Sequence, residues 1–282
     1  MPEEIIISDR ESLEKTKKSI LKDGPQKVHI LADFDKTLTR AFVGGKSTPS
    51  LISILRDENY LTADYTQTTK KLYEKYHLIE ISPEIPLAEK KKLINEWYVK
   101  VFNLLIDSGL TKEILEKVIN SDRVQFRQGF NEFIDILKIN NIPLVIMSAS
   151  GLGEEAISMF LEKEGKLYEN IHIVSNSFQW DENGRALAVK EPIIHSMNKD
   201  ETLLENFPFF QKIENRKNVI LLGDNLEDIN MVLGFGYDNL LKVGFLNEKT
   251  EESLEHYKKA FDVVILNDVS LNYINNLLKE II

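Results

Sequence analysis

Short apolar runs alternate with amphipathic segments along most of the chain, and this pattern predicts an α/β fold. Buried strands are expected at residues 28–32, 142–147, 171–175, 218–222, 241–244 and 262–266. Helical spacing predicts helices at residues 13–21, 131–139, 154–165 and 271–281. Strands that alternate with helices favour a doubly wound, mostly parallel sheet. An Asn-Gly turn within residues 178–185 adds a predicted hairpin.

The pattern changes between residues 47 and 121, where several helical spacings occur without a convincing strand. The signal Thr48-Pro49-Ser50 predicts the start of one helix. Further helices are expected at residues 66–76, 87–106 and 111–119. We therefore expect an α/β core of residues 1–43 and 123–282, with a helical cap domain of residues 44–122 inserted into it.

Three of the apolar strands end in polar clusters. Asp33 and Asp35 follow the first strand, Ser148 follows the second, and Asp224 and Asp228 follow the strand at 218–222. The carboxyl ends of parallel strands can meet at one crevice, where ligands bind. Carboxylates this close repel one another, so the cluster calls for a cation. Oxygen-only ligands beside a phosphate favour Mg²⁺, which we assign to Asp33 and Asp224.

Phosphoryl transfer is the chemistry that suits this cluster. Asp33 can attack phosphorus to form an aspartyl-phosphate, and Asp35 can pass a proton to the leaving oxygen. Ser148, just before a predicted helix, can bind an anion, and Lys199 can neutralise it. Each residue also has an ordinary explanation: Asp33 and Asp35 could form a turn after a strand, Ser148 could be a helix N-cap, and Lys199 could be a solvated surface lysine.

Composition narrows the classes of function. The net charge is 35 minus 45, or −10, which disfavours binding to a nucleic-acid polymer. The absence of cysteine excludes disulfides and thiolate zinc sites. The acidic start at residues 1–4 lacks the features of a signal peptide, and no apolar run has the length of a membrane span. We expect a cytoplasmic protein that is a monomer or a weak oligomer and has no membrane partner.

The order of the polar motifs resembles that of the haloacid dehalogenase superfamily. Its four motifs correspond here to Asp33-x-Asp35-x-Thr37, Ser148, Lys199, and Gly223-Asp224 with Asp228. From about Lys27 onward the chain also resembles the cytosolic pyrimidine 5′-nucleotidases, the type III cytosolic nucleotidase family. The matching stretches are residues 33–40, 79–83, 96–100, 174–176, 181–184, 198–199, 220–224 and 243–247.

This resemblance implies Mg²⁺-dependent hydrolysis of nucleoside 5′-monophosphates. CMP and UMP are the expected substrates, some members favour 7-methyl-GMP, and phosphotransfer to a second nucleoside is also implied. The resemblance implies that Asp33 is the nucleophile and a metal ligand, and that Asp35 is an acid/base whose backbone oxygen also faces the metal. Asp224 is implied as a metal ligand and Asp228 as a supporting carboxylate. Phosphate binding is implied for Ser148, Ala149 and Lys199, and nucleoside contacts for Glu80 and Tyr98. Tyr98 is equally compatible with a core aromatic position.

Two positions depart from the family pattern. Val101 replaces a serine near the base, which affects the expected base preference. Ser150 replaces a glycine after Ala149, and it either crowds the phosphate loop or adds a donor to it. The alternatives are a phosphoserine-type phosphatase of the same superfamily and a catalytically silent nucleotide-binding protein. Glu80 and Trp97-Tyr98 disfavour the first, and the complete set of motifs disfavours the second.

Overall fold

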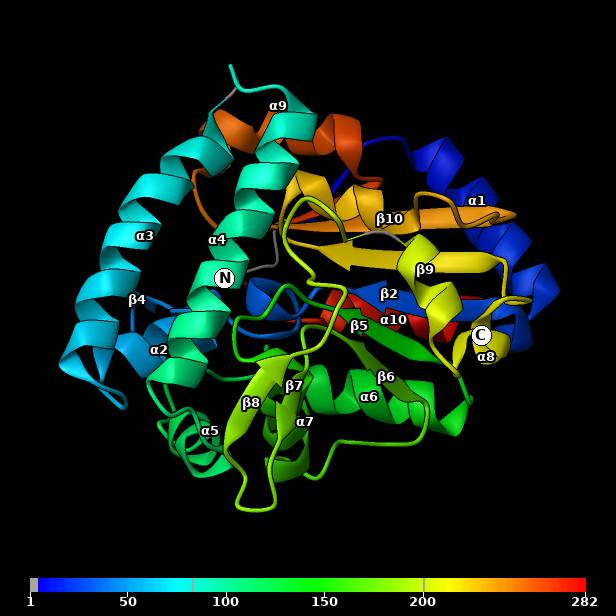
Figure 1. The fold of residues 1–282 in the computed structure, drawn as a ribbon. Helices are drawn as coiled ribbons and strands as arrows, with labels where there is room; N and C mark the ends of the chain where they lie inside the picture. The colour runs from blue at the N-terminus through cyan, green and yellow to red at the C-terminus, as the bar shows by residue number, and fades with distance from the viewer. Residues whose placement is uncertain (1–4, 83, 200) are drawn as a thin grey trace.

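A seven-stranded sheet forms the centre of the molecule in this computed structural model (Figure 1). The structure describes residues 5–82, 84–199 and 201–282, so the acidic start at 1–4, Pro83 of the 79–83 stretch and Asp200 lie outside it. In spatial order the strands are β1 (Ile5–Ile7), β11 (Val263–Leu266), β10 (Asn239–Leu246), β9 (Asn218–Gly223), β2 (Val28–Ala32), β5 (Leu144–Met147) and β6 (Ile171–Val174).

The predicted α/β class and the predicted strands are confirmed. All neighbouring pairs from β11 to β6 are parallel, whereas β1 runs antiparallel to β11 at the edge. Strand β1 was not predicted, because three isoleucines are too short a run to indicate a strand by themselves.

Helices cover both faces of the sheet. One face carries α1 (Arg10–Asp23), α6 (Phe130–Ile139), α7 (Gly153–Lys163) and α10 (Asn272–Ile281), and the other carries α8 (Phe210–Ile213), the 3₁₀ segment Leu226–Val232 and α9 (Thr250–Ala260). Along β2, Ile30 and Ala32 belong to the first apolar cluster and Leu31 to the second. A strand that is buried on both faces reads as a continuous apolar run, which explains the sequence pattern at residues 28–32.

A group of helices lies between β2 and β5 in the chain. After the two-residue strands β3 (Phe42–Val43) and β4 (Lys46–Ser47) come α2 (Leu51–Asp57), α3 (Ala63–Ile81), α4 (Leu87–Asp107) and α5 (Lys112–Ile119). Figure 1 shows α3 and α4 packed side by side at one end of the sheet. Their predicted helices are confirmed, although α3 extends beyond residues 66–76 at both ends.

The helical group shares its apolar core with the sheet. Leu51, Phe102 and Leu115 belong to the same buried cluster as Ile30 of β2. The hairpin of β7 (Phe178–Trp180) and β8 (Ala186–Val189) joins this packing, since Ala186 N donates to Leu110 O at 2.9 Å. Among the described residues, no helix has the length and apolar character that crossing a membrane requires.

Candidate active site

Three adjacent strands deliver the predicted polar residues to one edge of the sheet. Ala32 of β2 lies in register with Leu222 of β9 on one side and Ile146 of β5 on the other. Asp33 therefore leaves its strand between the ends of β9 and β5, close to Asp224 and Ser148. The convergence that strand order predicted is confirmed.

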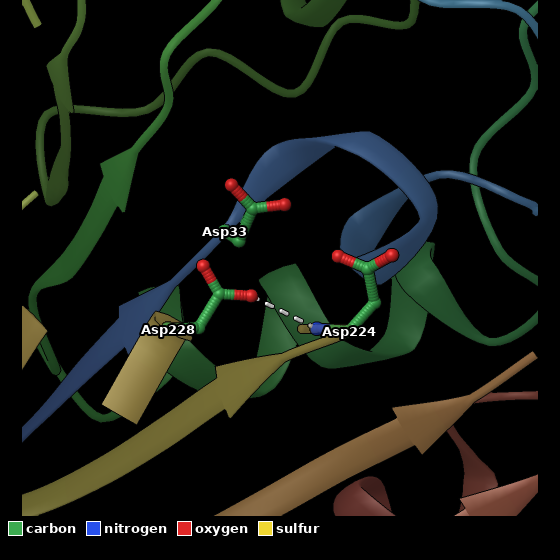
Figure 2. A group of neighbouring side chains, drawn as sticks. All are labelled: Asp33, Asp224 and Asp228. Carbon is green, nitrogen blue, oxygen red and sulfur yellow. Dashed lines mark hydrogen bonds between the residues drawn. The ribbon is translucent and has the colours of Figure 1, made fainter. Parts of the chain in front are cut away.

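Three carboxylates meet at this edge. One carboxylate oxygen each of Asp33, Asp224 and Asp228 lies within 4.8 Å of the others, and Figure 2 shows the three side chains around a shared space. Asp228 is held by its own loop, because its Oδ2 accepts hydrogen bonds from the backbone N–H groups of Asp224 (3.1 Å) and Asn225 (3.0 Å). The backbone thus fixes one carboxylate, and the other two face it.

Lys199 is the positive charge at the centre of this group. Its buried Nζ donates to Asp33 Oδ1 at 2.5 Å and to Asp228 Oδ1 at 3.0 Å. Burial by itself lowers the pKa of Lys199, but the charges of Asp228 and Asp33 outweigh burial and raise it. The lysine is therefore an ammonium ion, and one ammonium faces three carboxylates.

Burial and the excess of negative charge raise the pKa values of Asp33 and Asp224. Burial raises the pKa of Asp33 to about 7, and repulsion from Asp228 adds to this while Lys199 opposes it. The pKa of Asp224 is also raised, first by burial and then by the charge of Asp33. In the absence of a further cation, this cluster holds protons that ordinary aspartates release.

Asp35 lies on the turn that follows Asp33 and is not a member of the three-carboxylate group. The turn Phe34–Leu38 is irregular, because Asp35 is extended (φ −67°, ψ 130°) and Lys36 adopts a left-handed conformation (φ 56°). Thr39 Oγ1 accepts from Lys36 N at 2.9 Å and closes it. Burial raises the pKa of Asp35 to about 6, against the opposing charges of Lys199 and Lys36. A carboxyl group with this pKa can both give and take a proton near neutrality.

Ser148 and Ala149 lie at the end of β5. Ser148 Oγ accepts from Ser150 N at 3.2 Å, and Ser150 Oγ accepts in turn from Leu152 N at 3.3 Å. Ser150 therefore turns its hydroxyl back toward its own loop. A Cβ atom at Gly151 would approach Ile52 Cδ1 to 2.6 Å, so a larger residue here would displace the Ile52 side chain. The loop after β5 is thus packed directly against α2.

A cavity of about 1130 Å³ connects the strand ends to α2, α3 and α4. Every predicted site residue lines it: Asp33, Asp35, Glu80, Tyr98, Ser148, Ala149, Lys199, Asp224 and Asp228. Val101 and Ser150, the two departures from the family pattern, line it too. The structure brings the whole predicted set together around one space.

The helical wall of this cavity is tied to the sheet by two hydrogen bonds. Ser196 Oγ, in the loop that leads to Lys199, donates to Glu80 Oε1 of α3 at 2.7 Å. Tyr98 OH of α4 donates to Ala149 O at 3.3 Å. Each bond joins a predicted nucleoside-contacting residue to a segment beside a predicted phosphate-binding residue.

Several polar groups in the cavity wall were not predicted from the sequence. Thr48 Oγ1, Tyr65 OH and Trp97 Nε1 are buried there without a hydrogen-bond partner among the residues that the structure describes. Trp97 lies in a stretch that resembles the family, but the resemblance implied no role for it at the site. For Thr48 and Tyr65 the sequence carried no signal, since their burial depends on how α2 and α3 pack.

Comparison with known proteins first identifies the fold. The chain has the fold of the haloacid dehalogenase-type phosphatases: it superposes on a phosphoserine phosphatase, solved as a phospho-aspartyl intermediate analogue, with a TM-score of 0.52 and 21% identity over 88% of this chain and 97% of that one. Within that class, the chain belongs to the pyrimidine 5′-nucleotidase family (UMPH-1), whose sequence model matches residues 36–282.

Relatives at higher identity agree with this assignment. The human 7-methylguanosine phosphate-specific 5′-nucleotidase is 36% identical over 265 residues, which cover 94% of this chain and 88% of the human protein. The crystal structure of cytosolic 5′-nucleotidase IIIB bound to cytidine superposes with a TM-score of 0.86 and 28% identity, covering 98% of this chain and 93% of that chain. The family predicted from the sequence motifs is confirmed.

Proposed function

We propose that this protein removes the phosphate of nucleoside 5′-monophosphates, with CMP, UMP and 7-methyl-GMP as the substrates to test first. The observation that carries the proposal is the buried pair of Asp33 and Lys199 at the floor of a large cavity whose opposite wall is aromatic. A nucleotide matches these two surfaces, because its phosphate can bind at the Lys199 ammonium and its base can pack on the aromatic wall. The 7-methylguanosine phosphate specificity in the human relative's name and the cytidine in the related structure support these substrates.

Mg²⁺ is the cofactor that fits the carboxylates. All the available donors are oxygens, and the raised pKa values of Asp33 and Asp224 reflect negative charge that Lys199 alone does not balance. Asp33 and Asp224 would hold the ion together with the backbone oxygen of Asp35, and Asp228 would support the site. When bound, the ion would screen the charge between the substrate phosphate and the nucleophile.

The first half of the reaction transfers the phosphoryl group to the protein. A carboxylate oxygen of Asp33 bonds to phosphorus while the bond from phosphorus to the 5′-oxygen breaks. Asp35 gives its proton to that oxygen, so a neutral nucleoside leaves. Ser148, the Ala149 backbone and Lys199 bind the phosphate oxygens and keep phosphorus in line with Asp33.

The second half regenerates Asp33. Asp35, now ionised, removes a proton from water, whose oxygen bonds to phosphorus as the bond to Asp33 breaks, and inorganic phosphate is released. A pKa near 6 suits Asp35 to both proton transfers. A nucleoside hydroxyl in place of water would give the phosphotransferase activity, with a new phosphate monoester as product.

The helical wall would select the nucleoside. Glu80 would accept hydrogen bonds from the base or ribose, and the Tyr98 ring would stack on the base. Glu80 Oε1 already accepts from Ser196, and Oε2 lies 3.4 Å from His77 Nδ1, so a nucleoside would share the carboxylate with these two residues. We assign this wall to a cap domain of residues 44–122, whose movement relative to the core would admit and enclose the substrate.

The remaining assignments follow the same family. We propose that the protein works in the cytoplasm as a monomer or weak oligomer, with small nucleotides rather than nucleic-acid polymers or membranes as partners. Its net charge of −10 supports the exclusion of polymers.

The experiment is phosphate release from a panel of CMP, UMP, AMP, GMP, 7-methyl-GMP and phosphoserine, with Mg²⁺ and with EDTA. We expect Mg²⁺-dependent turnover of CMP, UMP or 7-methyl-GMP while phosphoserine is inert. Turnover of phosphoserine alone would support the proposed phosphoryl-transfer residues and contradict the assignment of the helical wall to nucleoside binding. Binding of the nucleotides without turnover would identify a catalytically silent protein.

A further inference from the structure

Arg127 is the largest fully buried side chain in the described part of the chain, with 1% of it exposed. It belongs to the segment that returns from the helical group to the sheet, just before α6. Its guanidinium donates to backbone carbonyls on three sides: Nε to Thr37 O at 2.8 Å, Nη1 to Val269 O at 2.8 Å, and Nη2 to Lys36 O. Nη2 also donates to Asn247 Oδ1 at 3.1 Å.

Two of these acceptors lie in the turn that carries the proposed acid/base. Lys36 and Thr37 directly follow Asp35, and the left-handed conformation of Lys36 reverses the direction of the chain after it. Buried carbonyls in an irregular turn need hydrogen-bond donors from elsewhere, because a buried acceptor without a donor destabilises the folded state. Arg127 donates to Thr37 O, and it shares Lys36 O with Asn247 Nδ2, which donates at 3.0 Å. By these bonds Arg127 fixes the shape of the turn.

Asp268 completes the arrangement on the other side of the guanidinium. Its Oδ1 lies 3.1 Å from Arg127 Nη1, and its two oxygens also accept from Ala41 N at 2.7 Å and Phe42 N at 3.0 Å. Ala41 and Phe42 lie where the chain leaves the sheet for the helical group. One buried ion pair therefore links the turn, the outgoing connection and the returning connection.

We propose that Arg127 is a positioning residue for the reaction, oriented by Asp268, which holds the turn that presents Asp33 and Asp35 to the cavity. Arg127 does not line the cavity, so it acts through these residues rather than on substrate. The catalytic consequence rests on the proposed function, whereas the effect on the turn does not.

The chain contains a matched control. Arg216 also donates to backbone carbonyls beside β2, namely Pro25 O at 3.1 Å, Val28 O at 3.0 Å and Asn141 O at 3.1 Å. It does so at the opposite end of the strand from Asp33. Arg127→Lys and Arg216→Lys thus remove the same guanidinium chemistry from the catalytic end and from the distal end of one strand.

The experiment measures kcat and KM for p-nitrophenyl phosphate and for the best nucleotide of the panel, together with Tm and amide hydrogen exchange. We expect Arg127→Lys to lower kcat by about tenfold or more with little change in KM, because a displaced acid or nucleophile costs rate rather than binding. Amides of residues 34–42 should exchange faster in this variant. Arg216→Lys should lower Tm without either effect.

Asp268→Asn provides a second route if Arg127→Lys fails to fold. It keeps the size of the side chain and removes the charge that orients the guanidinium, so it should reproduce the loss of kcat and the faster exchange in part. Because Asp268 accepts directly from Ala41 N and Phe42 N, only the amides of residues 34–38 test the role of Arg127 in this variant. Unchanged exchange of residues 34–38 in the folded variant would overturn the proposal, as would an equal loss of kcat in Arg216→Lys. If the parent protein hydrolyses no phosphate ester, the proposed function fails and hydrogen exchange still decides the role of Arg127.

Discussion

The two walls of the cavity are built in different ways. The wall at the strand ends carries three clustered carboxylates, and the ammonium group of Lys199 contacts two of them, Asp33 and Asp228. Asp33 and Asp224 directly follow buried strands. The helical wall carries aromatic rings and one carboxylate, Glu80, and contacts the opposite side through two hydrogen bonds. The first wall is dense in charge and follows directly from the ends of buried strands. The second wall consists of helix side chains, and its helices share an apolar core with the sheet.

Under the proposed function, the wall at the strand ends carries out the reaction and the helical wall selects the nucleoside. Reacting groups have to be held within fractions of an ångström, which strand ends in a parallel sheet provide. Selection of a nucleoside needs contact area and a few polar groups, and helices that pack through side chains supply these. We therefore expect substitutions in the charged wall to change kcat, and substitutions in the helical wall to change KM.

The largest effect should come from the nucleophile. Asp33→Asn keeps the size of the side chain and removes the attacking carboxylate, so kcat should fall by about 10⁴-fold or more. Because the variant also removes one of three repelling carboxylates, Tm should change little. Phosphate release from the preferred nucleotide and a thermal melt measure both quantities. Normal turnover by this variant would show that Asp33 is not the nucleophile.

A change of pH should affect the charged wall next. In the metal-free protein, carboxylates with raised pKa values favour folding when protonated, and this stability is lost as pH rises through about 7, the pKa of Asp33. Mg²⁺ takes the place of the protons, so its addition should raise Tm by several degrees more at pH 8 than at pH 6. Asp224→Asn should remove most of this difference. An equal Mg²⁺ effect at both pH values would contradict the proposed ligands.

The smallest effect should come from the helical wall. Glu80→Gln keeps the hydrogen bond from Ser196 within reach but weakens acceptance from a nucleoside, so KM should rise about tenfold with little change in kcat. Glu84→Gln is the control, since Glu84 is exposed and does not line the cavity. A fall in kcat at unchanged KM would contradict the assignment of Glu80 and the helical wall to substrate binding.

The sequence predicted the charged wall better than the helical wall, for a physical reason. Asp33, Ser148 and Asp224 each follow a buried strand directly, so one local pattern places each of them. Glu80 and Tyr98 have no such signal and entered only through resemblance to a family. Where they face depends on how α3 and α4 pack against each other.

Longer-range contacts explain most of what was missed. Arg127 finds its acceptors 90 and 142 positions away in the chain, at Thr37 and Val269, and no local pattern reports such pairing. Helix α9 was also missed, although a signal was present. Its acidic first turn and basic last turn, Glu251-Glu252 and Lys258-Lys259, complement the helix dipole and indicate its boundaries.

The short edge strand β1 has a consequence for handling the protein. Its three isoleucines pair with β11, whose Val263–Leu266 run is wholly apolar and otherwise lies at the border of the sheet. Uncovered apolar edges recruit other chains by strand addition. A truncation that removes residues 1–7 would therefore leave the proposed catalytic groups in place but expose the edge of β11. We expect such a protein to self-associate, so a poor yield would report self-association rather than a loss of activity.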